Sequence, residues 1–502
     1  MKNSQKIKYN LLVGFGSQLL TIILGILVPR LTLVSYGSEV NGLLSSVLQI
    51  YSYIGLLEAG IGTATLQALY HTVGTDDHGK TNAILAATNR YYKRAGCFYV
   101  LAVLLFSCLY PLLVETEIPT GTVMIIILFN GVGTITSFFY QNKYLLLLQA
   151  EGKNYVETIL TTLINVLRNV AKIVLMAMGM DVLLVQTVSM LIGFVRVIYV
   201  SLYIRRHYDW IDLSVEPDFG SISQSKNVLV HQFSNLINNN TDVVLLTVFC
   251  DLKVVSVYSL FAMLFSMVSN AMTVFSDSVM FSLGQTFHAD RKRFDQMYDA
   301  YELCYLALVF SLYSVALYFI LPFVRCYTAG VTDINYLDPL VPMMMVLIHL
   351  LSYGRSAPNH VINIAGHFKK TQYRSVLESL INIVASVIAV QRWGIYGVLM
   401  GTIVSLVYRV NDMILYVSKR ILLRSAWITY WRWFVNFAVF FAVQKLSRQI
   451  PVKLDSYVSI VLFCIPYAIC TLVIFFGISF AANPGTVKPL LRFARERFQK
   501  RS

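Results

Sequence analysis

The chain has 502 residues, of which 57% are hydrophobic and only 13% are Asp, Glu, Lys or Arg. Ordinary globular domains carry about 25% charged residues, so this composition excludes a chain made of soluble domains. The formal net charge is +14. Basic loops that touch anionic lipid account for this excess without nucleic acid as a partner. We therefore expect an all-α integral membrane protein that contacts membrane lipid.

About fourteen apolar segments follow one another along the chain, each of roughly 20 residues, the length that a helix needs to cross the hydrocarbon core. Residues 1–10 are polar and basic and lead into the first segment without a visible cleavage site, which predicts a retained helix rather than a signal peptide. The expected spans lie near residues 11–33, 40–62, 95–114, 121–148, 155–178, 182–204, 227–249, 254–283, 299–324, 338–365, 372–391, 395–418, 427–445 and 456–481.

Basic residues gather in alternate connections between these spans. Examples are Lys6 before the first span, Arg205 and Arg206 after the sixth, and Arg424 and Arg432 near the thirteenth. Positively charged loops stay on the cytoplasmic side of a membrane. An even number of spans then places both the N-terminus and the C-terminus in the cytoplasm, and the resemblance described below makes this membrane the bacterial cytoplasmic (inner) membrane.

The chain also repeats itself. Residues 160–170 of the fifth span share their pattern of Leu, Ile, Asn and Val with residues 377–387 of the eleventh. Two repeats of six spans have the same orientation and are related by an axis along the membrane normal. We predict an N-lobe at residues 1–204, a cytoplasmic connection at 205–226, a C-lobe at 227–420, and two further spans with a basic tail at 421–502.

Polar stripes on the first twelve spans, and their absence from spans 13 and 14, predict two lobes around a central cationic cavity and two peripheral helices.

Residues 78–94 mix Ile84, Leu85 and Tyr91 with basic residues, which predicts an amphipathic helix on the cytoplasmic surface. The tail 487–502 has a similar pattern, and a disordered basic tail is the alternative.

Cationic side chains inside the spans are the most informative feature of the sequence. A charge at membrane depth costs at least about 2.5–3.5 kcal/mol, so it normally faces a protein interior or a water-filled cavity. Arg168 and Lys172 share a helix face with Asn165. Arg409 and Asp412, three residues apart, are expected to neutralise each other instead. The predicted substrate-binding residues are Arg30, Arg168, Lys172, Arg196, Arg355, Asn165 and Asn359.

A guanidinium group donates two parallel hydrogen bonds, which suits a phosphate. A cavity lined by several such groups favours an anionic cargo such as a diphosphate. Intramembrane acids are candidates for a coupling site for H⁺ or Na⁺, namely Asp242, Asp277, Glu58 and Glu378. Asp242 leads because it follows the oxygen-rich residues 238–241, although hydrogen bonds from those Asn side chains are an equal alternative. No nucleotide-binding loop, metal-ligand cluster or catalytic set is evident, so we expect a transporter without a cofactor and not an enzyme.

Two passages resemble a known family. The first reads Pro29-Arg30-Leu31, then Tyr36-Gly37-Ser38-Glu39-Val40-Asn41-Gly42-Leu43, and ends Leu57-Glu58-Ala59-Gly60-Ile61-Gly62. The second reads Asn240-Thr241-Asp242-Val243-Val244-Leu245-Leu246, followed by Val257-Tyr258-Ser259. Both resemble the Wzx-type flippases of polysaccharide biosynthesis, within the multidrug/oligosaccharidyl-lipid/polysaccharide (MOP) exporter superfamily. Two departures are Glu58, where that family often has Asp, and Phe249-Cys250, where it usually has Leu-Gly.

The resemblance implies that two six-helix lobes rock around a central cavity. It further implies that the cargo is an undecaprenyl-diphosphate-linked oligosaccharide of O-antigen or capsule type, and that a polysaccharide polymerase and glycosyltransferases are partners. Two alternatives of the same superfamily stay open, a lipid II flippase and an ion-coupled multidrug exporter. A membrane scaffold for glycan-assembly enzymes is the alternative that does not transport.

Overall fold

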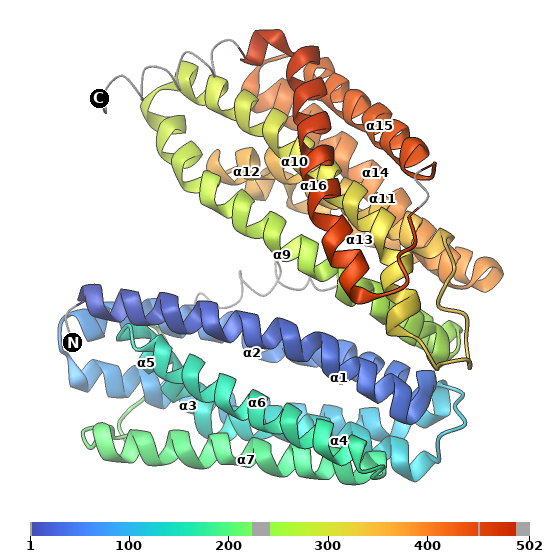
Figure 1. The fold of residues 1–502 in the computed structure, drawn as a ribbon. Coiled ribbons are helices and arrows are strands. Elements are labelled where there is room, and N and C mark those ends of the chain that lie inside the picture. Colours follow the sequence, from blue (N-terminus) through green and yellow to red (C-terminus); the bar gives the residue numbers. More distant parts are fainter. Residues whose placement is uncertain (1–2, 223–240, 450–451, 488–502) are drawn as a thin grey trace. The chain divides into compact units, whose positions relative to one another are not determined.

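A computed structural model of the chain describes residues 3–222, 241–449 and 452–487 (Figure 1). The regular secondary structure in these ranges is helical, which confirms the predicted fold class. Eleven of the described helices are long and apolar enough to cross a membrane. The chain is therefore a multi-span membrane protein.

The described residues form two compact units, of which the first contains residues 1–256 and 330–334. Its helices correspond to the first six expected spans. Their bounds are α1 Asn3–Ile54, α2 Leu56–Gly74, α3 His78–Leu113, α4 Thr120–Thr136, the π-helix η1 Ser137–Gln141, α5 Asn142–Ala150, α6 Asn154–Ala177 and α7 Val182–His207. Residues 241–249, the described part of the seventh span, are also helical.

The second unit contains residues 257–329 and 335–502. Its elements are α9 Leu252–Ala289, which begins in the first unit, then α10 Arg291–Tyr327, α11 Leu340–Gly354, α12 Ser356–Ile364, α13 Phe368–Trp393, α14 Ile395–Val417, the π-helix η2 Ser418–Leu422, α15 Trp427–Ser447 and α16 Tyr457–Ala482. The order from α10 to α14 repeats the order from α3 to α7, with a long helix, an interrupted helix and a helical pair. The lobes predicted from the sequence, residues 1–204 and 227–420, have other limits than these units and stay a prediction.

The first two spans are joined without a loop, because α1 runs through both with a break at Gly37. Gly37 has φ = 81°, a left-handed conformation that residues with a Cβ rarely adopt. The helix restarts at Ser38, whose amide and hydroxyl both donate to the Asp333 carboxylate, at 2.8 and 2.6 Å. Partial burial opposes ionisation of Asp333, but these two hydrogen bonds outweigh it and lower its pKa.

The prediction of a surface helix at residues 78–94 is wrong. These residues are the first half of α3, continuous with the third span, and Ile84, Leu85 and Tyr92 are buried. The connection after α7 packs against this part of α3. The side-chain amide of Asn82 donates to the Trp210 carbonyl oxygen at 3.0 Å, and the backbone N–H of Asp218 donates to the Ala83 carbonyl oxygen at 3.1 Å. The connection therefore covers the apolar side of this part of α3, which explains why apolar and basic residues alternate in its sequence. The similar prediction for the tail falls on residues 488–502, outside the described residues.

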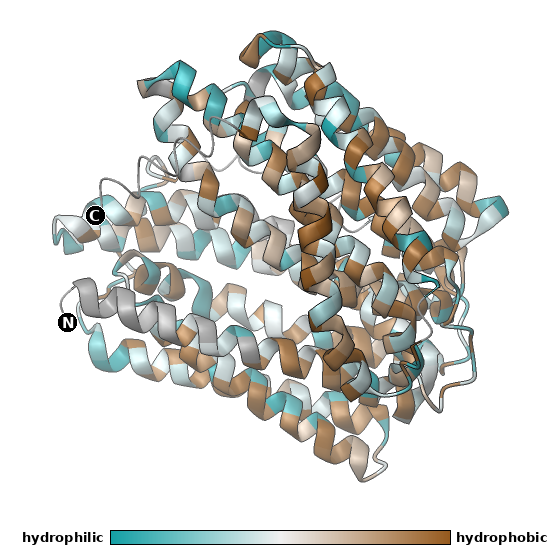
Figure 2. Ribbon diagram, turned by 45° about the horizontal axis from the view of Figure 1, so that its top comes forward, coloured by the Kyte–Doolittle hydropathy of each residue, from teal (hydrophilic) through white to brown (hydrophobic). Residues whose placement is uncertain are grey.

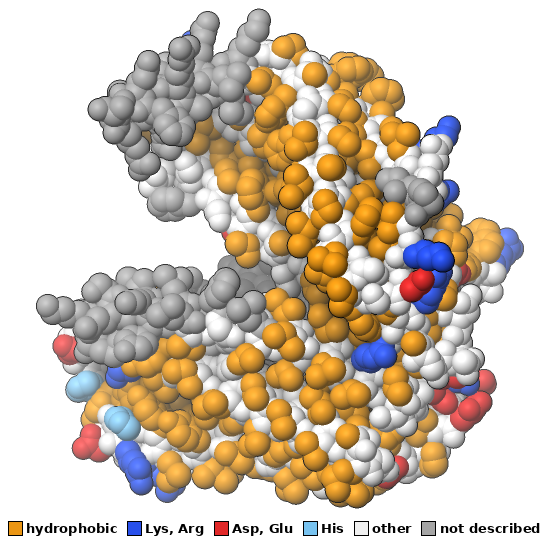
Figure 3. Space-filling model, in the orientation of Figure 1, with side chains coloured by type: hydrophobic (Ala, Val, Ile, Leu, Met, Phe, Trp, Pro, Cys, Tyr) orange, Lys and Arg blue, Asp and Glu red, His pale blue; other side chains and the backbone are white. Residues whose placement is uncertain are grey.

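Hydrophobic residues run along most of the length of the helices, and many hydrophilic residues lie at helix ends and in connections (Figure 2). Side chains on the outer faces are apolar and exposed, including Leu112 on α3, Leu167 on α6 and Leu462 on α16. Figure 3 shows broad hydrophobic faces on both units with few charged side chains. This distribution fits a lipid-covered surface, because lipid is as apolar as a protein core.

Candidate functional site

Helix α6 separates apolar from polar side chains more sharply than its neighbours. Leu163, Leu167, Val170 and Val174 recur at helical spacing and are exposed. The opposite face carries Glu157, Thr161, Asn165 and Arg168, all of which line one pocket inside the first unit. The two faces match a helix with lipid on one side and a polar pocket on the other.

The opposite wall of this pocket comes from the fourth span, which is interrupted. The π-helix η1 lies between α4 and α5, and single π-helical turns occur frequently at functional sites. Asn130 of α4 and Ser137 and Gln141 of η1 line the pocket. Only 1% of Gln141 is exposed to solvent. The interruption thus contributes polar side chains to the pocket wall.

Helix α7 completes the pocket with Gly193 and Arg196. The cavity volume is about 530 Å³, within the range of about 300–1,000 Å³ that is common for small-molecule sites. Such a volume holds a segment of a large lipid-linked molecule rather than the whole of it. The remaining lining residues are Gly133, Thr134, Thr136, Asn142, Leu145, Leu146, Gln149 and Ile164.

The charged groups that line the pocket are Arg168, Arg196 and Glu157, so cations exceed anions there. Arg196 Nη2 lies 3.3 Å from Glu157 Oε1, and Arg168 Nη2 donates to Asn165 Oδ1. Three buried polar atoms at the pocket have no hydrogen-bond partner among the described residues, namely Gln141 Oε1, Thr161 Oγ1 and Arg196 Nε. Buried polar groups are normally satisfied, so a bound water is the simplest partner for these atoms.

A second, smaller pocket lies between α1 and α6, with a volume of about 300 Å³. It shares Asn165 with the first pocket. Leu20, Leu24, Val28 and Val166 make its lining mostly apolar. Polar and apolar cavities therefore meet at α6.

The structure brings three of the predicted substrate-binding residues to this site, namely Arg168, Arg196 and Asn165. Lys172 continues the same helix but is not among the lining residues, and no carboxylate pairs with it in the described part of the chain. Arg30 lies on α1, which packs against α6. Arg355 and Asn359 belong to the second unit.

In the second unit, Arg355 is part of an ion network. Its guanidinium contacts Glu378 Oε1, and Glu378 Oε2 lies 3.2 Å from Arg409 Nε. Arg409 Nη1 lies 3.1 Å from Asp412 Oδ2, as the spacing of these two residues predicts, and Arg374 contacts the other oxygen of Asp412. Each carboxylate in this network touches two guanidinium groups. The geometry favours a structural role for Arg355.

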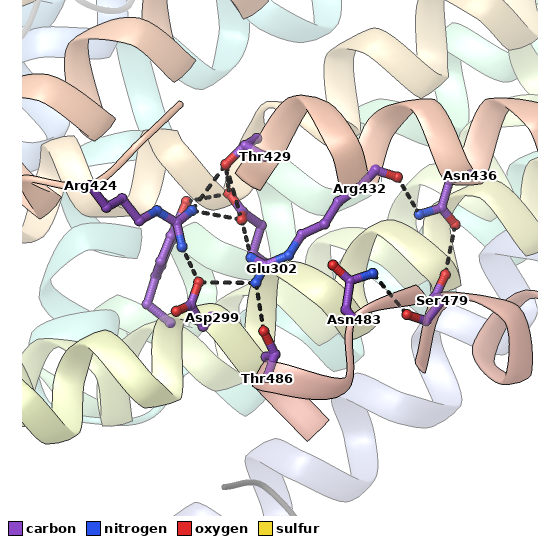
Figure 4. Close-up of polar contacts among 10 residues, drawn as sticks. Asp299, Glu302, Arg424, Thr429, Arg432, Asn436, Ser479, Asn483 and Thr486 are labelled. Carbon is purple, nitrogen blue, oxygen red and sulfur yellow. Dashed lines mark hydrogen bonds and ion pairs between the residues drawn. The ribbon is translucent and has the colours of Figure 1, made fainter. Parts of the chain in front are cut away.

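A third charged cluster was not predicted from the sequence (Figure 4). Glu302 of α10 accepts hydrogen bonds from Arg424 at 2.8 Å, from Thr429, and from Arg432 of α15. Asp299 also pairs with both arginines. Both Glu302 and Arg432 are only 1% exposed. The basic residues that the sequence places near the cytoplasmic surface thus join α10 to α15.

The candidate coupling acids lie in different surroundings. Glu378 is held in the ion network, Asp242 is buried, and Asp277 lies on an exposed position of α9. Glu58 lies on α2, but its side chain is outside the described part of the structure. The residues 238–240 that precede Asp242 also lie outside the described residues.

Glu157 was not among the site residues predicted from the sequence, because it falls at the edge of the fifth expected span. A signal was present. Glu157 precedes Thr161 by four residues and Asn165 by eight, so it extends the polar face of α6 by one turn. The pairing of Glu157 with Arg196 of α7, however, depends on the contact between two helices and not on spacing along the chain.

No protein-family model matches the chain, and no curated protein matches it in sequence. Solved structures do match. The structure of the lipid II flippase MurJ in an inward closed conformation has a TM-score of 0.69 and 13% identity, with 94% of this chain and 99% of that chain covered. An inward-facing multidrug resistance MATE family transporter of the MOP superfamily has a TM-score of 0.64 and 14% identity, with 79% of this chain and 95% of that chain covered.

The structure of the MATE multidrug transporter DinF-BH has a TM-score of 0.53 and 15% identity, covering 80% of this chain and 93% of that chain. At such identities, the similarity shows the fold. The chain has the fold of MOP superfamily transporters.

Proposed function

We propose that this protein is a flippase that moves an undecaprenyl-diphosphate-linked oligosaccharide across the bacterial cytoplasmic membrane by alternating access, for O-antigen or capsule synthesis. The observation that carries the proposal is the pocket beside α6. It contains the guanidinium groups of Arg168 and Arg196 and one carboxylate, Glu157. The fold shared with a lipid II flippase and with multidrug transporters supports transport as the general activity.

The chemistry of the pocket matches two parts of such a substrate. Guanidinium groups bind phosphate oxygens through charge-assisted, paired hydrogen bonds. The amides and hydroxyls of Asn130, Ser137 and Gln141 suit the hydroxyl groups of a sugar. A polymerase and glycosyltransferases would then act on either side of this step, with both chain termini cytoplasmic.

A lipid II flippase remains a second candidate, because the fold is shared and the cargo is also a lipid carrying sugars. A multidrug exporter is a weaker candidate. Organic cations gain little from a pocket in which positive charge exceeds negative charge.

Transport by the purified protein in proteoliposomes tests the proposal. We expect a fluorescent undecaprenyl-diphosphate oligosaccharide to cross the bilayer, and Arg168→Gln and Arg196→Gln to slow it at normal protein level. Arg206→Gln is the control, because Arg206 is exposed at the end of α7. Transport of a cationic dye but not of the lipid-linked sugar would favour the exporter, and transport of neither would favour the scaffold.

A further inference from the structure

Glu157 is the one carboxylate among the described residues that line the pocket. Its ion pair with Arg196 is a single contact of 3.3 Å between one nitrogen and one oxygen. About a quarter of each side chain is exposed, 27% for Arg196 and 28% for Glu157. The pair is therefore accessible from the pocket and is not locked by a paired contact.

The other charged groups near Glu157 leave it without a second partner among the described residues. On α6 itself, Arg168 donates to Asn165. The lining residues of α4, η1 and α5 are uncharged, and the α5 side chain Lys143 donates to the Phe139 carbonyl oxygen. Arg30 on α1 does not line the pocket. Arg196 is thus the counter-ion of Glu157, and its buried Nε has no partner of its own in the described part of the chain.

We propose that Glu157 is a proton-binding site coupled to the anionic cargo, and that the pocket takes up a proton when a diphosphate replaces Glu157 at Arg196. This inference rests on the proposed function. Glu157 is not among the coupling sites predicted from the sequence. One of those sites, Glu378, is held by two guanidinium groups.

The step is an exchange of partners. Two phosphate oxygens accept hydrogen bonds from the Arg196 guanidinium, which releases the carboxylate. The released carboxylate then faces a second anion at close range, which disfavours its charged form. A proton from water binds to a carboxylate oxygen, and the neutral acid can donate a hydrogen bond to the phosphate. Because the coupling is reciprocal, a protonated Glu157 must also tighten the binding of the diphosphate.

Calorimetry on the full-length protein in nanodiscs tests this step. The probe is a short-chain polyprenyl diphosphate ester of N-acetylglucosamine, and its binding heat is measured in buffers of different ionisation enthalpy. We expect uptake of up to about one proton per ligand, and an affinity that rises by as much as about tenfold for each pH unit lowered. Glu157→Gln should bind the probe at every pH without proton uptake.

Two further variants complete the test. Glu157→Asp keeps a titrating group and should keep proton uptake. Glu151→Gln removes a carboxylate that pairs with Lys153 outside the pocket, and it should behave as the wild type. Binding of the probe without proton uptake, or with uptake that survives in Glu157→Gln, would overturn the coupling site but not the flippase. Failure of the wild-type protein to bind the probe at any pH would overturn both.

Discussion

The two units of the molecule use intramembrane arginines in opposite ways. In the second unit, Arg355, Arg374 and Arg409 share two carboxylates, Glu378 and Asp412. In the first unit, Arg168 has an amide partner and Arg196 has a single contact with Glu157. The first arrangement joins helices. The second leaves hydrogen-bond donors directed at a cavity.

This difference separates two explanations of a charge at membrane depth. An intramembrane arginine must find partners, and either protein carboxylates or a ligand can supply them. In the network of the second unit, Arg355, Arg374 and Arg409 each have at least one carboxylate partner within the protein. In the pocket of the first unit, a bound anion would add partners to Arg168 and Arg196, whose contacts there are with one amide and one carboxylate.

The largest expected effect is loss of stability when the network of the second unit is broken. Glu378→Ala leaves Arg355 without its carboxylate and removes one of the two that contact Arg409. Removing one partner of a buried ion pair costs about 3–5 kcal/mol. We expect a large fall in folded protein and in unfolding temperature, measured by fluorescence-detected size-exclusion chromatography. Glu157→Gln is the matched control and should unfold near the wild-type temperature.

The next effect is loss of ligand affinity without loss of stability. Arg168→Gln and Arg196→Gln each remove charge-assisted hydrogen bonds to an anion, worth about 1.5–3 kcal/mol each. We expect affinity for the diphosphate ester probe to fall by about 10–150-fold, while the unfolding temperature stays near that of the wild type. Equal losses of stability in these variants and in Glu378→Ala would remove the distinction between the two units.

Two double-mutant cycles on the free energy of unfolding measure how strongly one ion pair in each unit is coupled. The cycle of Arg374→Met with Asp412→Asn should give a coupling energy of about 0.5–3 kcal/mol, because the pair lies within a network. The cycle of Arg196→Gln with Glu157→Gln should give less than about 1 kcal/mol, because the contact is longer and partly exposed. A larger coupling in the second cycle would mean that the Glu157 pair is structural.

The smallest effect is expected for Lys172→Gln. Lys172 lies one turn beyond Arg168 but does not line the pocket. Its charge would act on a bound anion through the electric field and not through contact, which is worth about 1 kcal/mol or less. We expect the affinity for the diphosphate ester to fall by less than about fivefold, in the same binding assay. A loss as large as that of Arg168→Gln would extend the site along α6.

Much of the fold follows from the sequence. Apolar segments of sufficient length predict the spans, and helices lie at the expected segments in the described residues. The failure at residues 78–94 has a physical reason. A helix half covered by apolar side chains looks the same in sequence whether lipid or another segment covers it, and here residues 208–222 pack against it.

Part of the candidate site was also predictable from the sequence. Spacing along α6 placed Asn165 and Arg168 on one face, because helical geometry is local. Spacing could not show that Arg196 lies against Glu157, or that Gln141 is buried beside them in a π-helical turn.

The membrane class, the order of the spans and the cost of placing charge inside them follow from the sequence alone, because these depend on composition and local geometry. Which charges have partners depends on the tertiary structure. Arg355 and Glu378 are 23 residues apart in the chain and Arg432 and Glu302 are 130 apart, and each pair joins different helical segments. Such pairs form only where two helices pack together, and that packing depends on the side chains of the whole unit and not on any one segment.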